Sequence, residues 1–557
     1  MVDQIAVFAL ALFTECDNLL QNIHSSEHNA KMTDTSIPAP LPWRASRAKL
    51  DIFSAVIRSA KEFGSKTVAI VDGDGTEVDY KTLLRGAFAL GSALGKKFSK
   101  DETVGIMLPT GAGAVIAFCA VLASGRLPAM LNFTAGSANI NSAMKAGKIT
   151  KIVTAHKFVE LGGLESLIAE LDDAAEFIYL EDVRESLGLM DKVAGGLGPV
   201  FPGLFHRRQS HKKPGVVLFT SGTEGEPKGV VLSHHNIVAN VEQVRSHIGL
   251  DPEHDSVFNP LPTFHCFGLT VGAILPLVAG VRAVFHPSPL QPREIAGRIA
   301  ETKATILLAT DTFIGQYARV AKDGAMDSVR LAVCGAERVK DETRAFVRKK
   351  FDIEILEGYG ATEAAPVVAA NSIEFNKPGT VGKLMADMEY ELVPVEGIEE
   401  GGKLRIRGPN IMLGYMRSSA PGVIEPLPEG WHDTGDICIV DEDDCIRIMG
   451  RVKRFAKIGG EMVSLAVVEN CASAIWPDDM HAAAAIPDPR KGEQVVLLST
   501  AKDADRAALL AWCQSHGVSE LSVPRKVFHV EEVPVLGTGK TDYGAVNRMV
   551  QALTEPA

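Results

Sequence analysis

Short apolar runs alternate with longer helical patterns through most of this chain. Apolar residues recur at helical spacing in residues 52–63 and 80–98, and short apolar runs occupy 67–71, 103–108 and 151–154. This alternation is typical of layers in which helices cover a buried sheet. The chain is therefore predicted to have an α/β fold.

The length of 557 residues, 46% of them hydrophobic, is enough for two or more domains. Residues 1–48 show weak periodicity and contain a proline-rich stretch, so the globular part is expected to begin near Leu50. After Gly382, short strand patterns between Gly, Pro and Asp turns indicate a small β subdomain, and the last hundred or so residues indicate an α+β domain. The predicted boundaries are 1–48, 49–451 and 452–557.

The charge and the cysteines exclude some classes of protein. The net charge is -12, from 57 basic and 69 acidic residues without a dense run of Lys or Arg, which argues against a nucleic-acid partner. The eight cysteines are scattered without a Cys-x-x-Cys pair. This pattern suits a reducing cytoplasm and argues against a structural zinc site.

Two apolar segments bear on membrane association. Residues 5–13 are too few to span a bilayer and no basic residue precedes them, so the segment is interpreted as a frayed helix or one that touches the inner face of the membrane peripherally. Residues 256–281 carry no charge but include Pro260, Pro262 and Pro276. This composition favours a buried strand, loop and helix over a transmembrane helix.

A loop rich in glycine and hydroxyl groups follows the apolar run at 216–219. Glycines let backbone N–H groups approach an anion, hydroxyls donate hydrogen bonds, and a lysine adds a positive charge. The loop is not the standard P-loop, because its lysine follows Pro227 and precedes Gly229. It indicates phosphate binding, with a solvated turn as the alternative. The residues concerned are Thr220, Ser221, Gly222, Thr223, Gly225 and Lys228.

Three later motifs could complete a nucleotide site. Tyr359 could stack on a base, while Thr362 contacts phosphate and Glu363 holds Mg²⁺, which prefers carboxylate and phosphate oxygens. The turn 433–436 places a carboxylate where a ribose diol could bind, and 450–454 supplies a basic cluster. Each motif by itself is more often an ordinary loop or a solvated strand edge.

The order of these motifs distinguishes them from chance. Thr-Ser-Gly-Thr with Lys-Gly, Tyr-Gly-Ala-Thr-Glu, Thr-Gly-Asp, Gly-Arg and Gly-Thr-Gly-Lys follow one another along the chain. In this arrangement the chain resembles the AMP-forming acyl-acid ligases of the adenylate-forming superfamily, from about Leu50 to the C-terminus. The resemblance implies ATP and Mg²⁺ as cofactors. It also implies a large N-terminal adenylation domain of layered α/β sheets with a small β subdomain, and a small mobile α+β C-terminal domain.

The resemblance also implies a role for each matching residue. Residues Thr220 to Lys228 would hold the β- and γ-phosphates, and Thr223 would join Glu363 at the metal. Thr362 would meet the α-phosphate. The adenine would lie among Gly335, Ala336, Glu337, Gly358 and Tyr359, and the ribose would bind Asp436 and Arg451.

The C-terminal domain would supply the moving parts. By resemblance, Lys453 is the hinge residue, Lys457 lies in the segment brought over the site for the second step, and Lys540 is the catalytic lysine of adenylation. A carboxylate that attacks the α-phosphate brings negative charges together, and a lysine that bridges both stabilises the transition state electrostatically.

The acid and the acceptor are predicted from further segments. Residues 262–268 resemble the wall of the acid pocket, with Phe264 and His265 beside the carboxylate, and 269–277 could border an acyl tunnel or form a plain core helix. This stretch contains no Arg or Asp that could select an amino-acid substrate, so a fatty acid is predicted.

The acceptor is predicted to be acyl carrier protein, with coenzyme A as the alternative. Segments 127–136, 177–182 and 453–462 resemble the acyl-acyl-carrier-protein synthetases, including the synthetase half of the bifunctional acyltransferase/synthetase. Acyltransferase activity is not expected, because neither His24 nor His28 is followed by Asp five positions later. A protein that keeps the fold but only binds is the remaining alternative.

Overall fold

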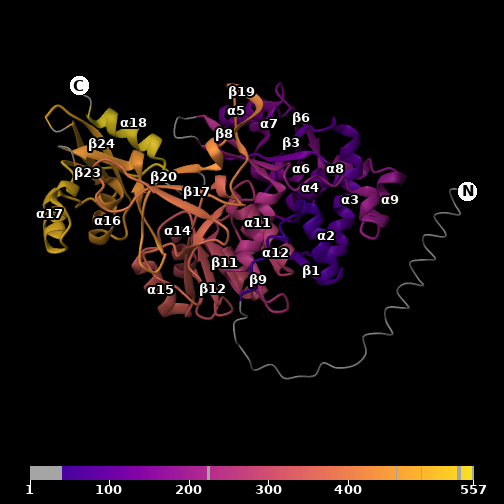
Figure 1. Ribbon diagram of the computed structural model, residues 1–557, viewed down its shortest axis with the longest axis horizontal. Coiled ribbons are helices and arrows are strands. Elements are labelled where there is room, and N and C mark those ends of the chain that lie inside the picture. The colour runs from indigo at the N-terminus through magenta and orange to yellow at the C-terminus, as the bar shows by residue number, and fades with distance from the viewer. Residues whose placement is uncertain (1–39, 222–225, 459–460, 491, 536–540, 555–557) are drawn as a thin grey trace, which may run out of the picture. The chain divides into compact units, whose positions relative to one another are not determined.

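The computed structural model describes residues 40–221, 226–458, 461–490, 492–535 and 541–554, all within one compact unit, 39–557 (Figure 1). Its secondary structure is a mixture of helices and four sheets. The predicted α/β fold class is confirmed. The domain boundaries at 48 and 451 stay predictions.

The first sheet has nine strands in the order β15-β14-β13-β12-β11-β9-β10-β1-β2. The strands from β13 to β1 in this order are parallel, and the outer pairs are antiparallel. Their bounds are β1 Val68–Val71, β2 Glu77–Asp79, β9 Ser256–Asn259, β10 Arg282–Phe285, β11 Ile306–Ala309, β12 Leu331–Cys334, β13 Glu354–Gly360, β14 Val367–Ala370 and β15 Lys383–Leu384.

The second sheet has eight strands in the order β19-β18-β8-β7-β4-β3-β5-β6. Here β7 and β8 form an antiparallel hairpin, in which Thr220 lies opposite Lys228. The bounds are β3 Thr103–Ile106, β4 Leu127–Met130, β5 Lys151–Thr154, β6 Glu176–Tyr179, β7 Pro214–Ser221, β8 Pro227–Ser233, β18 Gly414–Arg417 and β19 Ala420–Pro426.

Helices between and around these sheets share one hydrophobic core with both of them. Helix α4 contacts β3, β4 and α2, while α12 contacts α2 and β10, so the helices bridge the two sheets. Ten of the twelve residues of α4 are buried, as expected of a helix that is apolar on all sides. The helices are α2 Ile52–Glu62, α3 Tyr80–Lys97, α4 Ala112–Ala123, α5 Ser137–Gly147, α6 His156–Gly162, α7 Glu165–Leu171, α8 Leu180–Glu185, α9 Leu189–Leu197, α10 Pro202–Phe205, α11 His234–Arg245, α12 Leu275–Ala279, α13 Pro292–Thr302, α14 Asp311–Val320 and α15 Asp341–Phe351.

The predicted β subdomain is a third, antiparallel sheet in the order β16-β17-β20-β21. The residues after 454 form a fourth sheet with hydrophobic clusters of their own. The bounds are β16 Glu389–Val393, β17 Gly402–Arg407, β20 His432–Val440, β21 Ile446–Arg451, β22 Phe455–Ile458, β23 Glu461–Ser464, β24 His481–Asp488, β25 Gly492–Ser499, β26 Lys526–His529, α16 Leu465–Ile475, α17 Arg506–Ser515 and α18 Tyr543–Thr554, with 3-10 turns at Thr362–Ala364, Pro428–Gly430, Val452–Arg454 and Glu520–Ser522.

The uncharged segment 256–281 folds as the buried strand, loop and helix that its prolines predict. Strand β9 leads through a loop into a π-helix, Phe267–Ile274, which continues as α12. None of the helices in the described part of the chain is both long and apolar enough to cross a membrane. The apolar segment 5–13 lies outside the described residues.

Candidate active site

One large cavity brings together most of the residues that the motifs predict. It has a volume of about 2280 Å³, and its lining comes from the first three sheets and from the part of the chain from residue 454 onward, including Arg454, Glu469 and Tyr543. The predicted site residues that line it are Thr220, Lys228, His265, Gly335, Ala336, Glu337, Gly358, Tyr359, Thr362, Glu363, Asp436 and Arg451. Gly222, Thr223, Gly225 and Lys540 lie outside the described residues, as does the side chain of Ser221.

Parallel strands explain why distant segments meet at this cavity. The chain leaves β11, β12 and β13 at the same edge of the first sheet, so the residues that follow these strands come together. Ala336 follows β12 with a φ of 71°, a left-handed conformation that is uncommon outside glycine. Next to it, Glu337 Oε2 accepts hydrogen bonds from Thr312 N at 3.1 Å and Thr312 Oγ1 at 2.9 Å. This wall is therefore held by contacts between loops.

A buried ion pair that the sequence analysis did not single out supports the same wall. Glu357 Oε2 accepts from Arg344 Nη2 at 2.5 Å, and Glu357 Oε1 accepts from Val339 N at 3.1 Å. Because Glu357 is only 4% exposed, losing either partner would leave an uncompensated charge in the interior. In the sequence, the only indication that Glu357 has a structural role is its position directly before Gly358.

Tyr359, Asp436 and Arg451 form a second hydrogen-bonded group. The Tyr359 hydroxyl donates to Asp436 Oδ2, and Arg451 Nε donates to Asp436 Oδ1 at 3.1 Å. Asp436 and Arg451 lie opposite each other in the register of β20 and β21. Burial raises the pKa of Asp436, while Arg451 and Tyr359 act against that shift. The result is a carboxylate fixed at the wall, with its charge balanced by the guanidinium.

Glu363 and Lys228 are linked through Tyr415, a residue that the sequence analysis missed. The Tyr415 hydroxyl donates to Glu363 Oε1 at 2.8 Å, and Lys228 Nζ lies 5.8 Å from the centre of the Tyr415 ring. Strand β18 pairs with β8 so that Tyr415 faces Val230, two residues beyond the lysine. Burial and the Glu363 charge raise the pKa of Tyr415 far above its ordinary value, so it stays a donor. A single Gly-Tyr pair in a strand offered no signal for this role.

The donor set fits Mg²⁺ better than a metal held by protein alone. The described residues contain no cluster of three or more His, Cys, Asp or Glu that could hold a metal ion. Mg²⁺ commonly binds one or two carboxylates together with substrate phosphates. Glu363, a carboxylate in the cavity wall near Lys228, suits that mode.

The other end of the cavity is apolar. It is lined by Val257 of β9, Ile306 of β11, Val244 of α11, Ile248 just after α11, Val271 of the π-helix and Leu275 of α12. Asn259 Nδ2 donates to Gly268 O at 3.0 Å, and a Cβ on Gly272 would lie 2.1 Å from this amide nitrogen, so the missing side chain of Gly272 makes room for Asn259. The π-helix and the start of α12 thereby place Val271 and Leu275 in the cavity wall. His265 lines the same cavity, with its ring centre 4.8 Å from that of Phe264.

Two predicted residues do not line the cavity. Lys453 lies in the turn between the third and fourth sheets, and Lys457 lies on β22 with its Nζ 3.3 Å from Glu396 Oε1. Their neighbour Arg454 lies 3.6 Å over the Tyr543 ring and pairs with Glu469 at 2.6 Å. The hinge role of Lys453 and the second-step role of Lys457 stay predictions.

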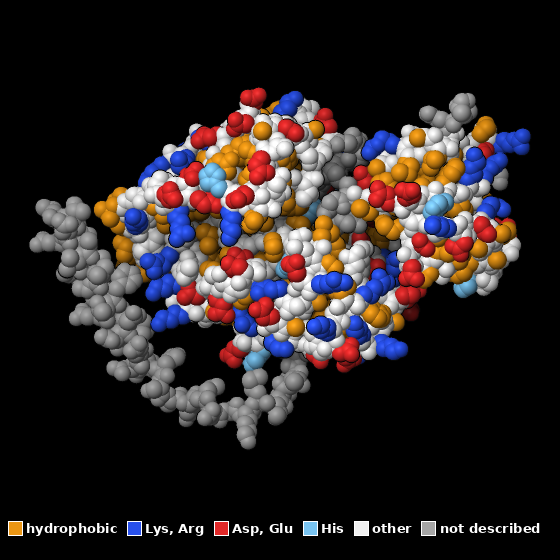
Figure 2. All heavy atoms as spheres, turned by 180° about the vertical axis from the view of Figure 1, so that it is seen from behind, with side chains coloured by type: hydrophobic (Ala, Val, Ile, Leu, Met, Phe, Trp, Pro, Cys, Tyr) orange, Lys and Arg blue, Asp and Glu red, His pale blue; other side chains and the backbone are white. Residues whose placement is uncertain are grey.

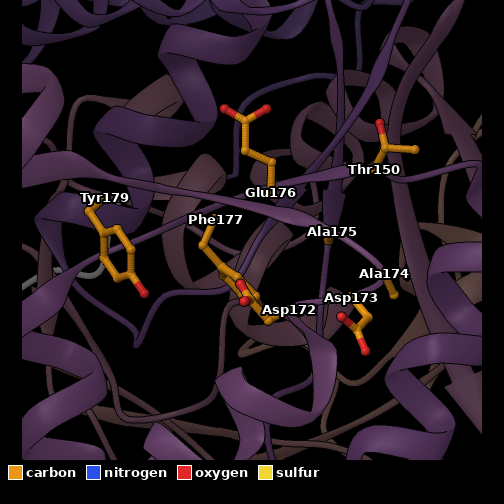
Figure 3. A pocket seen from close by; sticks show the side chains of 8 residues that line it. All are labelled: Thr150, Asp172, Asp173, Ala174, Ala175, Glu176, Phe177 and Tyr179. Carbon is orange, nitrogen blue, oxygen red and sulfur yellow. The ribbon is translucent and has the colours of Figure 1, made fainter.

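A second hollow of about 520 Å³ lies near β6 and contains none of the predicted residues (Figure 3). Asp172, Asp173 and Glu176 line it without any basic side chain. An anionic acid or phosphate would be repelled there, so the large cavity is the candidate site.

Comparison with known proteins shows the fold and the family of the chain. Two solved structures share the fold. Anthranilate CoA ligase AuaEII in complex with anthranoyl-AMP has a TM-score of 0.76 and 20% identity, and the match covers 92% of this chain and 100% of that one. ATP-bound MatB from Rhodopseudomonas palustris has a TM-score of 0.77 and 21% identity, and the match covers 91% of this chain and 100% of that one. The model of the AMP-binding enzyme family matches residues 56–416. The chain belongs to this family.

Among the similar curated proteins are two CoA ligases. The long-chain-fatty-acid–CoA ligase of Salmonella typhimurium is 30% identical over 355 residues, which is 60% of this chain and 62% of that protein. Peroxisomal OPC-8:0-CoA ligase 1 of Arabidopsis thaliana is 30% identical over 322 residues, which is 56% and 57%. The chain thus aligns with less than two thirds of the length of these relatives.

Proposed function

We propose that the protein activates a fatty acid with ATP to an acyl-adenylate, releases pyrophosphate, and transfers the acyl group to a thiol with release of AMP. The observation that carries this proposal is a single cavity with a charged end, formed around Glu363, Lys228 and Asp436, and an apolar end formed by the π-helix. A nucleotide and an acyl chain could lie in it with the reacting carboxylate beside His265.

The residues divide the first reaction between them. Asp436, held by Arg451, accepts hydrogen bonds from the ribose hydroxyls, and Lys228 places a positive charge on the departing phosphates. Glu363 would hold Mg²⁺, which would supply positive charge beside the phosphates. Thr362 donates to the α-phosphate, and Lys540 bridges it to the attacking carboxylate.

The assignment of Lys540 has a direct test. We expect Lys540→Ala to lower ATP–pyrophosphate exchange by about 100- to 1,000-fold, because one electrostatic donor is lost from the transition state. Thioester formation from a supplied acyl-adenylate should be largely retained. Unchanged exchange would disprove the role of this lysine.

Coenzyme A is the acceptor that the names of the relatives favour, since these proteins are CoA ligases. Acyl carrier protein is the second candidate, favoured by the likeness of 127–136, 177–182 and 453–462 to the acyl-acyl-carrier-protein synthetases. An acidic carrier needs free basic side chains, yet Arg454 pairs with Glu469 and Arg525 with Asp488. Because the phosphates of coenzyme A also need basic partners, this pairing does not distinguish the two acceptors.

Incubation with laurate or palmitate, ATP and either coenzyme A or the holo-carrier protein would separate the two acceptors. Acyl-CoA alone would exclude the carrier protein, and acyl-carrier alone would exclude coenzyme A. If no acid of a broad panel released pyrophosphate, the protein would be a binding protein that keeps the fold.

A further inference from the structure

The surface at α9 and α10 concentrates exposed apolar side chains. Five of the sixteen large apolar side chains that are exposed in the described part of the chain lie within residues 189–204. Their exposed fractions run from 53% to 79%. Such a grouping on a protein surface commonly marks a site of interaction. The five are Leu189, Met190, Val200, Phe201 and Leu204.

Basic side chains accompany this apolar group. Between residues 189 and 213 the only acid is Asp191, which is buried, whereas Lys192, Arg207, Arg208, Lys212 and Lys213 are exposed. The segment 189–213 is therefore net positive, whereas the whole chain carries a net charge of -12. Helix α9 lies on the right of Figure 1 and therefore on the left of Figure 2, which views the molecule from behind. At this left edge, Figure 2 shows hydrophobic side chains beside Lys and Arg. We define the α9–α10 surface as Leu189, Met190, Val200, Phe201 and Leu204 with Lys192, Arg207 and Arg208.

Buried contacts hold both helices in place, so the exposed apolar side chains stand on a fixed base. Asp191 accepts from Ser92 Oγ and Lys96 Nζ, each at 2.6 Å. A Cβ on Gly198 would lie 2.4 Å from the Phe88 ring, which shows how closely α9 packs on α3. After α10, His206 Nε2 lies 2.9 Å from Asp51 Oδ1, and both side chains are buried.

We propose that the α9–α10 surface binds the headgroup region of an anionic lipid bilayer. Apolar side chains that enter the interface, rimmed by Lys and Arg that pair with anionic headgroups, are the features that hold interfacial proteins on membranes. This inference goes beyond the proposed function and does not rest on it.

Other occupants fit the surface less well. A second copy of the chain packed face to face would set one basic rim against the other, which is repulsive. A peptide helix would need a groove, whereas none of the eight side chains lines either hollow described above. The acidic segment 1–38, with five acids and one lysine, is the strongest rival and is tested below.

The experiment is cosedimentation of the full-length chain with vesicles of phosphatidylcholine and phosphatidylglycerol, with pure phosphatidylcholine as reference. One variant combines Lys192→Gln, Arg207→Gln and Arg208→Gln, and another combines Leu189→Ser, Met190→Ser and Leu204→Ser. Each basic side chain is expected to contribute about a factor of five to the affinity, so the variant without the three basic side chains should bind the anionic vesicles roughly 100-fold more weakly. The second should weaken it at least about tenfold.

Matched controls lie elsewhere on the described surface. Arg293→Gln, Lys322→Gln and Lys349→Gln remove three exposed charges, and Leu161→Ser, Leu290→Ser and Val423→Ser remove three exposed apolar side chains. These controls should bind like the unaltered chain. All variants should keep their thermal unfolding midpoint, which shows that they fold.

Three results would overturn the proposal. The first is equal binding by the α9–α10 variants and the controls, including no binding by any of them. The second is that deletion of residues 1–39 abolishes vesicle binding while the α9–α10 variants still bind. This result would assign the membrane contact to the N-terminal segment. The third is a dimer in sedimentation velocity that the α9–α10 variants convert to a monomer.

Discussion

The two ends of the cavity are built in different ways. At the charged end, Glu363 and Asp436 are each held by side chains from other strands, Tyr415 in one case and Tyr359 with Arg451 in the other. At the apolar end, β9 and the π-helix form a wall by packing, with Asn259 filling the space beside Gly272. The charged end therefore depends on individual hydrogen bonds, while the apolar end depends on shape.

The largest effect is expected where a charge is removed from the charged end. We expect Glu363→Gln to reduce ATP–pyrophosphate exchange by about 100- to 1,000-fold, because the carboxylate that suits Mg²⁺ becomes neutral while its shape is kept. Binding of Mg·ATP, followed by calorimetry, should weaken as well. Glu374→Gln, at an exposed glutamate, should change neither quantity. Equal rates in both variants would show that Glu363 takes no part in catalysis.

A smaller effect is expected from the residue that positions this carboxylate. Tyr415→Phe removes one hydrogen bond to a charged group, which should raise the Mg²⁺ concentration for half-maximal ATP binding by about tenfold. Excess Mg²⁺ should restore most of the activity. A merely structural defect would lower the thermal midpoint without this rescue. Tyr390→Phe, at a tyrosine that is 40% exposed, is the control.

The apolar end should respond to volume and not to charge. Val271→Phe adds a ring to the cavity wall, so we expect kcat/KM for palmitate to fall by about tenfold or more while that for a short acid changes little. Val423→Phe, at an exposed valine, should leave the ratio of the two unchanged. An equal loss for both acids would indicate that the acyl chain does not pass Val271.

The smallest effect concerns two histidines, one at each end. Burial lowers the pKa of His432 at the charged end and of His247 at the apolar end, where Nε2 lies 2.7 Å from Ala370 O. The unfolded chain therefore takes up protons near pH 6.5 while the folded chain does not, so stability is lost as the pH falls below 6.5. Thermal unfolding between pH 7.5 and 5.5 would measure this slope.

Removing either histidine should flatten that slope. We expect His247→Gln and His432→Gln each to reduce the loss of stability on acidification, whatever their effect at neutral pH. His516→Gln, at an exposed histidine, should keep the full slope. If all three variants followed the same pH curve as the unaltered chain, the buried imidazoles would not be the groups that titrate.

Much of the architecture could be predicted from local pattern. The apolar runs at 151–154 and 216–219 became β5 and part of β7, and the helical patterns at 52–63 and 80–98 became α2 and α3 within a residue. Period and composition suffice for such elements because burial of one face is a local property of the sequence. The sequence predicted a helix after residue 267 but not its π form, in which Gly268 O accepts from Asn259 of β9.

The sequence by itself determined which type of chemistry to expect, because the residues predicted to bind phosphate, the aromatic ring and the acids of the candidate site occur in short contiguous motifs. Only the tertiary structure decided which groups hold them. Tyr415 lies 52 residues from Glu363, and Tyr359 lies 77 residues from Asp436. A hydrogen bond between such residues follows from strand order and register, which bring side chains together regardless of their separation along the chain.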